Sequence, residues 1–155
     1  MKKSGGDEGE IMKIHHATRE KVNEIYLFGK KVHELDFSKK YPFHQRAELT
    51  EATSDKNSIL LVAEENKEVV GFLLAKIIFY RAGGWCMLDN IAVRKDFQGN
   101  GISNLLLKSL YLILRKRKVH YVQVLEEMHH KNTRKFWKHE GFRETKKFIW
   151  AEKGI

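Results

Sequence analysis

The sequence contains few residues that cross-link or interrupt a chain. Among its 155 residues there is one cysteine, Cys86, so no disulfide can form within the chain. The one proline, Pro42, predicts a break between two helical segments. No apolar run reaches the ~18 residues of a membrane-spanning helix, and we therefore expect no membrane partner. A chain of this length must be held together by its core, for which its 42% hydrophobic residues provide the material.

The N-terminus lacks the apolar stretch of a secretory signal. Residues 1–10 consist mainly of Lys, Ser, Gly, Asp and Glu. We therefore expect a short flexible tail over residues 1–10, one domain over residues 11–155, and a cytoplasmic location.

Positive charge exceeds negative charge. The chain has 29 Lys and Arg against 20 Asp and Glu, a net charge of +9, which favours anionic partners in general. Residues 115–118 (RKRK) would be the natural contact for nucleic acid. They also end a predicted helix, where cations complement the negative end of the helix dipole. No nucleic-acid motif occurs elsewhere, so the sequence favours the helix-end interpretation over a nucleic-acid partner.

Apolar periodicity predicts alternating helices and strands. Strands are predicted over residues 11–15, 58–64, 68–79, 85–93, 119–125 and 142–150. Helices are predicted from an N-cap at Thr18, over residues 43–52, after a glycine-rich turn near residue 100, and over residues 133–139 up to Gly141. Residues 65–67 can close a hairpin. The pattern predicts an α/β fold of one domain, with a mixed, largely antiparallel central sheet flanked by helices.

Residues 88–103 (LDNIAVRKDFQGNGIS) combine an apolar strand, a glycine-rich turn and the start of a helix. Glycines let the backbone approach a ligand closely, and a helix N-terminus attracts an anion. The turn is no Walker loop, because Gly101 is followed by Ile102 and Ser103 instead of Lys and Ser or Thr. It is a poor dinucleotide fingerprint, because Asn104 occupies the place of the third glycine.

This segment resembles the signature of the GNAT (GCN5-related) N-acetyltransferases, an apolar strand followed by Gln/Arg-Gly-x-Gly-x-Gly/Ala. Ser103 stands where the family usually has Gly or Ala, and the matching residues are Gln98, Gly99, Asn100, Gly101 and Ile102. Residues 132–142 resemble a second family motif, Asn…Tyr-x-x-x-Gly-Phe, with Trp137 in the place of the tyrosine. The likeness covers roughly residues 11–150 and extends to diamine and ribosomal-protein acetyltransferases.

The resemblance implies a transfer of an acetyl group from acetyl-CoA to a primary amine, by direct transfer in a ternary complex. The strand Ile91-Ala92-Val93 would bind the pantetheine arm, and its N–H groups would stabilise the developing oxyanion. Residues 98–103 would hold the pyrophosphate. Asn132, preferred by residue type to His130, would bind the arm. The implied cofactor-binding residues are Ile91, Ala92, Val93, Gln98, Gly99, Asn100, Gly101, Ile102, Ser103 and Asn132.

Asp89 and Trp137 are the candidate catalytic residues. An alkylamine with a pKa of ~10.4 arrives protonated, and Asp89 interrupts an apolar strand at a position where diamine acetyltransferases carry an acid. A surface aspartate bonded to a loop is the alternative, and Glu126 and Glu127 are second choices. Trp137 cannot transfer a proton, because its indole N–H is only a hydrogen-bond donor. A thiol has a pKa of ~8.5, so the thiolate can leave without being protonated.

Two pairs of adjacent histidines, His15-His16 and His129-His130, invite a metal interpretation. Adjacent side chains usually point apart, and no standard zinc spacing accompanies either pair. We therefore expect surface histidines and no metal.

Three functions remain open. The first is the N-acetyltransferase, whose partners are acetyl-CoA and an amine of a small molecule or a protein. A homodimer is compatible with this function. The second is a GNAT domain that binds acyl-CoA but is catalytically impaired, because of Trp137. The third is a small basic nucleic-acid-binding protein.

Overall fold

The computed structural model describes residues 12–36, 43–80, 83–149 and 151–155. The predicted tail, Ile11 and Pro42 lie outside these residues. The chain divides into two compact units, one ending at Leu125 and the other beginning at Glu126, and each is described by itself below.

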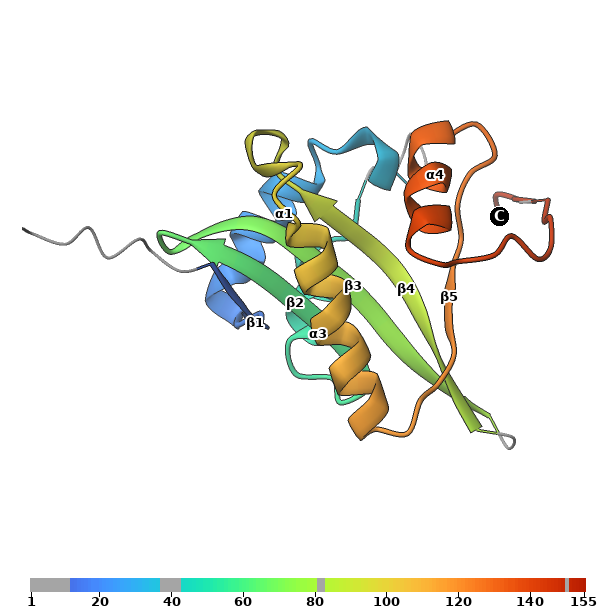
Figure 1. The fold of residues 1–155 in the computed structure, drawn as a ribbon, viewed down its shortest axis with the longest axis horizontal. Coiled ribbons are helices and arrows are strands. Elements are labelled where there is room, and N and C mark those ends of the chain that lie inside the picture. Colours follow the sequence, from blue (N-terminus) through green and yellow to red (C-terminus); the bar gives the residue numbers. More distant parts are fainter. Residues whose placement is uncertain (1–11, 37–42, 81–82, 150) are drawn as a thin grey trace, which may run out of the picture. The chain divides into compact units, whose positions relative to one another are not determined.

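The first unit contains a five-stranded sheet in the order β1-β2-β3-β4-β5 (Figure 1). Its strands are β1 (Lys13–His16), β2 (Ser58–Glu65), β3 (Glu68–Tyr80), β4 (Gly83–Val93) and β5 (Val122–Val124). Neighbours from β1 to β4 are antiparallel, whereas β4 and β5 are parallel. The helices are α1 (Val22–Gly29), α2 (Arg46–Ala52) and α3 (Ile102–Lys116), with 3₁₀ turns η1 (Arg19–Lys21), η2 (His33–Leu35) and η3 (Lys95–Phe97). The α/β fold with a mixed, largely antiparallel sheet is confirmed.

The hairpin between β2 and β3 closes where the sequence predicts it. Asn66 and Lys67 both have positive φ, 51° and 64°. Two such residues make the tight turn whose twist matches that of the flanking strands.

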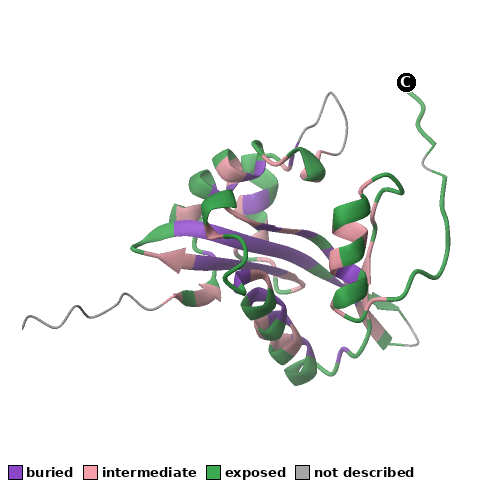
Figure 2. Ribbon diagram, turned by 45° about the horizontal axis from the view of Figure 1, so that its top comes forward, coloured by how far each residue is buried: buried purple, intermediate pink, exposed green. Residues whose placement is uncertain are grey.

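Both faces of the sheet are covered. One face packs against α1 and α2 in a cluster that includes Ile25, Phe43, Leu49, Phe72 and Leu74. The other face packs against α3, which contacts β2, β3 and β4. The buried side chains of α3 are Ile102, Leu106, Leu107, Leu110 and Leu114. Figure 2 shows the resulting buried band along the central strands.

The first helix is shorter than its apolar spacing suggests, and it ends at Gly29. A Cβ at Gly29 would overlap the ring of Phe43, so the close approach of that ring requires glycine at this position. Thr18 stands at the cap position of η1, but its hydroxyl makes no capping hydrogen bond. The prediction is therefore confirmed for the position of Thr18, but its hydroxyl does not provide the expected hydrogen bond.

The strand predicted over residues 119–125 is confined to Val122–Val124. Lys118 adopts a positive φ of 57°, and the N–H of Val119 donates to the carbonyl of Leu114. These residues thus complete the end of α3 and cannot pair as a strand.

The second unit contains α4 (Lys131–His139), which ends before Gly141, a residue with a φ of 86° as expected for the position after a helix. The strand predicted over residues 142–150 is absent from the described residues 142–149. Residues 143–147 (RETKK) are all polar or charged, so the middle of the segment has no apolar side chain to bury against a neighbour.

Within the described residues, no helix combines the length and the apolar character needed to cross a bilayer.

Candidate active site

Strand β4 contains one residue more than β3 at Asp89. Leu74 pairs with Asn90, and Ala75 pairs with Leu88, which leaves Asp89 as the extra residue of a bulge. Cross-strand partners share a face, so Leu88 lies on the face of Ala75 whereas Asn90 joins Leu74 on the opposite face. The bulge therefore reverses the alternation of side chains along β4.

The edge of β4 toward β5 is open beyond the bulge. Strand β5 pairs with β4 only from Cys86 to Leu88, and residues 89–93 of β4 have no β5 partner within the described chain. The N–H of Arg94 donates to Val70 on β3, at 2.8 Å. Because N–H groups alternate along a strand, those of Ile91 and Val93 point to the open edge.

The sequence predicts that Ile91, Ala92 and Val93 all bind the pantetheine arm. In the structure their N–H groups point to different sides of β4. Ile91 and Val93 direct their N–H groups to the open edge, whereas Ala92 directs its N–H to β3 by the same alternation. The Ala92 side chain is buried in the cluster under α1 and α2. An extended ligand arm at this edge would therefore find donors at alternate residues, as it would in an added strand.

Asp89 is the residue predicted to accept the proton of the amine. Its side chain reaches solvent between two buried neighbours, Leu88 and Asn90. Desolvation by the surrounding protein raises the pKa of its carboxyl group, although the positive charges of His44 and Lys76 oppose the shift. A raised pKa makes the carboxylate of Asp89 a stronger base.

His44 contacts Asn90, the residue that follows Asp89 in β4. His44 Nε2 donates to Asn90 Oδ1 at 2.8 Å, and His44 Nδ1 lies 3.3 Å from Glu48 Oε2. The His44 side chain is only 15% exposed, and Asn90 is buried. The ring of His44 thus links Asn90 of β4 to Glu48 of α2.

Sequence reasoning missed both residues. Asn90 gave a signal, because an amide inside an apolar strand needs a buried partner. His44 gave none, because it lies 46 positions before Asn90 and is placed by the loop that precedes α2. Glu48 is held independently, since its carboxylate also accepts from the N–H of Gln45 in the capping box of α2, at 2.9 Å.

The glycine-rich turn after β4 has the backbone that the sequence predicts. Gly99 and Gly101 have φ values of 81° and 76°, which favour glycine. A Cβ built on either would meet no atom within 4 Å. The space beside both residues is therefore open to a ligand.

The polar side chains of the turn brace it. Gln98 Nε2 donates to the carbonyl of Val93 at 3.0 Å, and Asn100 Nδ2 donates to the carbonyl of Phe97 at 3.1 Å. These bonds fix the path of the backbone between β4 and α3. The turn can consequently offer its main chain, more than its side chains, to a ligand.

Helix α3 begins at this turn with its positive end exposed. Gly101 is its N-cap, no side chain caps it, and its first turn contains no acidic residue. The first helical hydrogen bond runs from the N–H of Leu105 to Gly101, so the N–H groups of Ile102 and Ser103 have no partner within the helix. A cradle of glycines before an uncapped helix fits a pyrophosphate.

The second unit holds the two predicted residues of the downstream motif. Trp137 is buried, and its ring packs edge-on against Phe136 at 4.9 Å and Phe142 at 5.0 Å between centroids. Its indole N–H has no acceptor among the described residues. Asn132 lies exposed in the first turn of α4.

Three tyrosines that lie in apolar runs of the sequence are not all core residues. Tyr80 is 62% exposed and Tyr121 is 54% exposed, whereas Tyr111 is half-buried. Tyr80 stacks on Trp85 near the end of the β3–β4 hairpin, with ring centroids 4.6 Å apart.

The expectation that adjacent histidines point apart was wrong for one pair. The rings of His129 and His130 meet at 4.3 Å between centroids, and both approach Glu127. The loop preceding α4 is too irregular for the alternation of a strand to apply. His15 and His16 do lie on β1, where His15 approaches Glu64 at 3.5 Å.

Comparison with known proteins points to one family. The acetyltransferase (GNAT) family model matches residues 23–142. No curated protein matches the chain.

Several solved structures share the fold. An aminoglycoside acetyltransferase from an uncultured soil metagenomic sample, in complex with sisomicin, has a TM-score of 0.73 at 14% identity, covering 93% of this chain and 96% of that one. An aminoglycoside 6′-N-acetyltransferase from Acinetobacter baumannii has a TM-score of 0.73 at 16% identity, covering 94% and 99%. A third aminoglycoside acetyltransferase, bound to a bisubstrate analogue of CoA and acetylneamine, has a TM-score of 0.74 at 15% identity, covering 94% and 99%. At these identities the likeness concerns the fold.

Proposed function

The chain belongs to the GNAT acetyltransferase family, and on this premise we propose that it transfers the acetyl group of acetyl-CoA directly to a primary amine while both substrates are bound. The observation that carries the proposal is the open edge of β4, which leads straight into the glycine turn and the uncapped start of α3. An extended arm and a pyrophosphate, joined as they are in CoA, match these two features in that order.

The backbone does most of the binding in this proposal. Ile91 and Val93 direct N–H groups along the arm, and one of them faces the oxygen of the thioester as negative charge develops there. Residues 98–103 hold the pyrophosphate through main-chain N–H groups, and the amide of Asn132 binds the arm. Acetyl-CoA supplies an activated acyl group, and everything else is positioning and proton transfer.

Asp89 serves as the base. It takes a proton from the substrate ammonium, directly or through a water, so that the nitrogen lone pair can bond to the acetyl carbon as the carbon–sulfur bond breaks. The raised pKa of its carboxyl group brings it closer to that of the amine. His44 acts as a positioning residue, because its ring holds the side chain of Asn90, the residue that follows Asp89 in β4.

Trp137 takes the place of a general acid. The sulfur leaves as a thiolate, which is tolerable at neutral pH for a thiol of pKa ~8.5. The buried indole N–H of Trp137 lacks an acceptor among the described residues, and a sulfur anion could satisfy it. In this role Trp137 would steady the charge without moving a proton.

A second candidate function rests on the same residue. If departure of the thiolate needs an acid, Trp137 would leave a domain that binds acyl-CoA without turning it over. Binding with no product under any acceptor would favour this candidate.

The proposal is tested by an amine panel with acetyl-CoA, in which released thiol is measured. The panel contains polyamines, aminoglycosides, and peptides with a free N-terminus or a lysine. We expect thiol release above the hydrolytic background for at least one class. The net charge of +9 favours acceptors that are not strongly cationic.

A further inference from the structure

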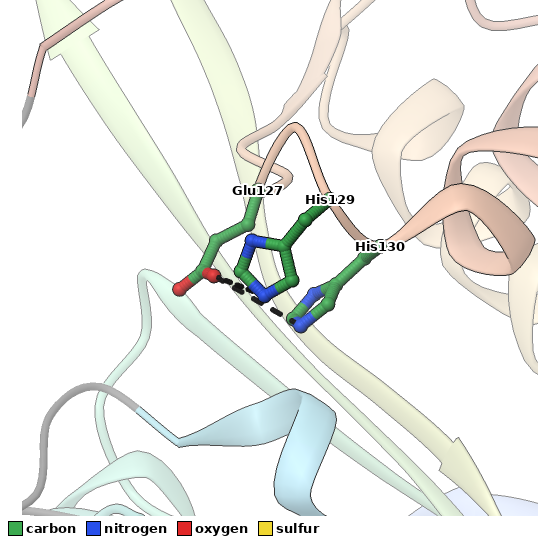
Figure 3. Close-up of side chains that lie close together, drawn as sticks. All are labelled: Glu127, His129 and His130. Atoms are coloured by element: carbon green, nitrogen blue, oxygen red, sulfur yellow. Dashed lines mark ion pairs between the residues drawn. The ribbon is translucent and has the colours of Figure 1, made fainter.

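We infer that Glu127, His129 and His130 form a site for a divalent transition-metal ion, with Zn²⁺ as the reference ion. Each residue offers one ligand atom, and these atoms lie within 4.8 Å of one another. Figure 3 shows the three side chains converging from the loop that precedes α4. The site lies within the second unit, and neither the family nor the proposed acetyl transfer requires it.

The distances suit a tetrahedral ion. Glu127 Oε2 lies 3.1 Å from His129 Nε2 and 3.9 Å from His130 Nε2. In a tetrahedral zinc site with bonds of about 2.0–2.1 Å, two ligand atoms lie about 3.3 Å apart. Both distances from Glu127 lie within about 0.6 Å of that value, and no two ligand atoms of the three residues are more than 4.8 Å apart.

A second carboxylate, that of Glu126, holds His130 in the form that a metal requires. His130 Nδ1 lies 2.8 Å from Glu126 Oε1, and the two side chains are 20% and 18% exposed. Because the carboxylate only accepts, Nδ1 carries the proton and Nε2 keeps its lone pair for the ion. Carboxylates commonly orient histidine ligands in this way. The N–H of Glu127 donates to the same Glu126 oxygen, at 3.1 Å, which holds this carboxylate in place.

The donor set selects the class of ion. Two imidazole nitrogens and one carboxylate oxygen favour Zn²⁺, Co²⁺, Ni²⁺ or Cu²⁺ over Mg²⁺ and Ca²⁺, which prefer oxygen ligands. His130 is also the N-cap of α4, whose positive end disfavours a cation. The charges of Glu126 and Glu127 together balance a divalent ion, so the site as a whole is neutral when loaded.

Loading would tie the loop to the start of α4. Glu127 and His129 precede the helix, and His130 is its first flanking residue. A bound ion would therefore restrain the helix that carries Asn132 and Trp137. The simpler alternative is a set of exposed ion pairs that binds nothing, since the Glu127 and His129 side chains are more than half exposed.

Titration of the full chain with Zn²⁺, followed by calorimetry, tests the site, and Co²⁺ provides an absorption spectrum that reports its geometry. We expect one ion per chain, strong visible bands of tetrahedral Co²⁺, and no heat with Mg²⁺. Glu127→Gln and His129→Asn should each weaken Zn²⁺ binding by at least tenfold. Glu126→Gln should weaken it by about 10–100-fold through the loss of the orienting carboxylate.

His139→Asn is the matched control, because it removes an exposed histidine of the same unit that pairs with Glu140 at 3.3 Å and stands outside the cluster. Its affinity for Zn²⁺ should equal that of the parent chain, and circular dichroism confirms that every variant is folded. Binding that survives Glu127→Gln unchanged, a loss equal in His139→Asn, or no saturable binding of Zn²⁺ would each overturn the inference. None of these readouts depends on acetyl transfer, so the two proposals stand or fall separately.

Discussion

Asp89 lies where β4 gains a residue over β3, and its side chain reaches solvent while Leu88 and Asn90 on either side are buried. In a regular strand, side chains alternate between the two faces. Leu88 and Asn90 would then share the buried face, and Asp89 would lie on the other face. The bulge also switches Asn90 to the face covered by α1 and α2, where His44 can reach it. The chemistry at this point of β4 thus depends on one inserted position.

Asp89→Asn is predicted to lower kcat/KM by roughly 10²-fold or more at neutral pH, because the amide cannot accept the ammonium proton. The affinity for acetyl-CoA should stay the same, since the binding groups belong to the backbone. Steady-state kinetics and calorimetry on the same preparation measure both. An unchanged rate across the whole pH range would return Asp89 to the role of a surface residue.

The same substitution has a signature in stability. The folded chain holds the proton of Asp89 more tightly than the unfolded chain, because its pKa is raised on folding. The free energy of unfolding therefore falls as the pH rises from the pKa of Asp89 in the unfolded chain, ~3.9, through its pKa in the folded chain. Asp89→Asn should remove that part of the slope in chemical denaturation across this range.

Two substitutions of Trp137 distinguish a packing role of its ring from a chemical role of its N–H group. Trp137→Phe keeps an aromatic ring against Phe136 and Phe142 but removes the N–H. If the N–H steadies the thiolate, kcat should fall about 5–10-fold, the equivalent of a hydrogen bond of about 1–1.5 kcal/mol, whereas the affinity for acetyl-CoA should change little. Trp137→Tyr should raise kcat only if departure of the thiolate limits turnover.

The control for this pair is the neighbouring ring. Phe136→Leu loosens the same packing without touching the N–H, so it reports on structure alone. A decrease in kcat that is equal in Phe136→Leu and Trp137→Phe would mean that the ring only packs.

At the scale of elements, the junction between β4 and α3 was predicted most fully. Its glycines specify the positive φ values, and the apolar face of the following helix specifies where it begins. Signals of this kind are local in sequence. The last predicted strand failed for the converse reason, since strand formation depends on a partner edge that residues 142–149 do not have among the described residues.

Gly101 offers a matched test of the pyrophosphate cradle. Asn and Asp both tolerate a φ of 76° better than other side chains, and a Cβ there meets no protein atom within 4 Å. Gly101→Asp should abolish measurable binding of acetyl-CoA by adding negative charge beside the phosphates. Gly101→Asn, with the same shape and no charge, should bind more weakly than the parent chain but clearly better than Gly101→Asp. Calorimetry gives both affinities.

Equal affinity in the aspartate variant and the parent chain, both folded by circular dichroism, would remove the pyrophosphate from this turn. Equal loss in the two variants would mean that shape, not charge, decides binding.

At the scale of the whole molecule, contacts distant in sequence were the ones that the sequence could not predict. His44 and Asn90 meet only because the loop before α2 and the bulge in β4 come to the same face of the sheet. No periodicity encodes that meeting. The family motifs, by contrast, indicated the reaction class, because the binding groups of this fold lie in the backbone and their pattern is one of glycines and strand residues.

The proposed reaction moves an acetyl group from acetyl-CoA to an amine. The most direct measurement follows acetyl-CoA labelled with ¹³C in the acetyl group, incubated with the acceptor selected from the amine panel, by NMR and mass spectrometry. We expect label in an amide of the acceptor, equimolar with released thiol, and a roughly 10²-fold slower appearance in Asp89→Asn. Label that appears as free acetate, or acetyl-CoA that binds and stays intact with every acceptor, would contradict it.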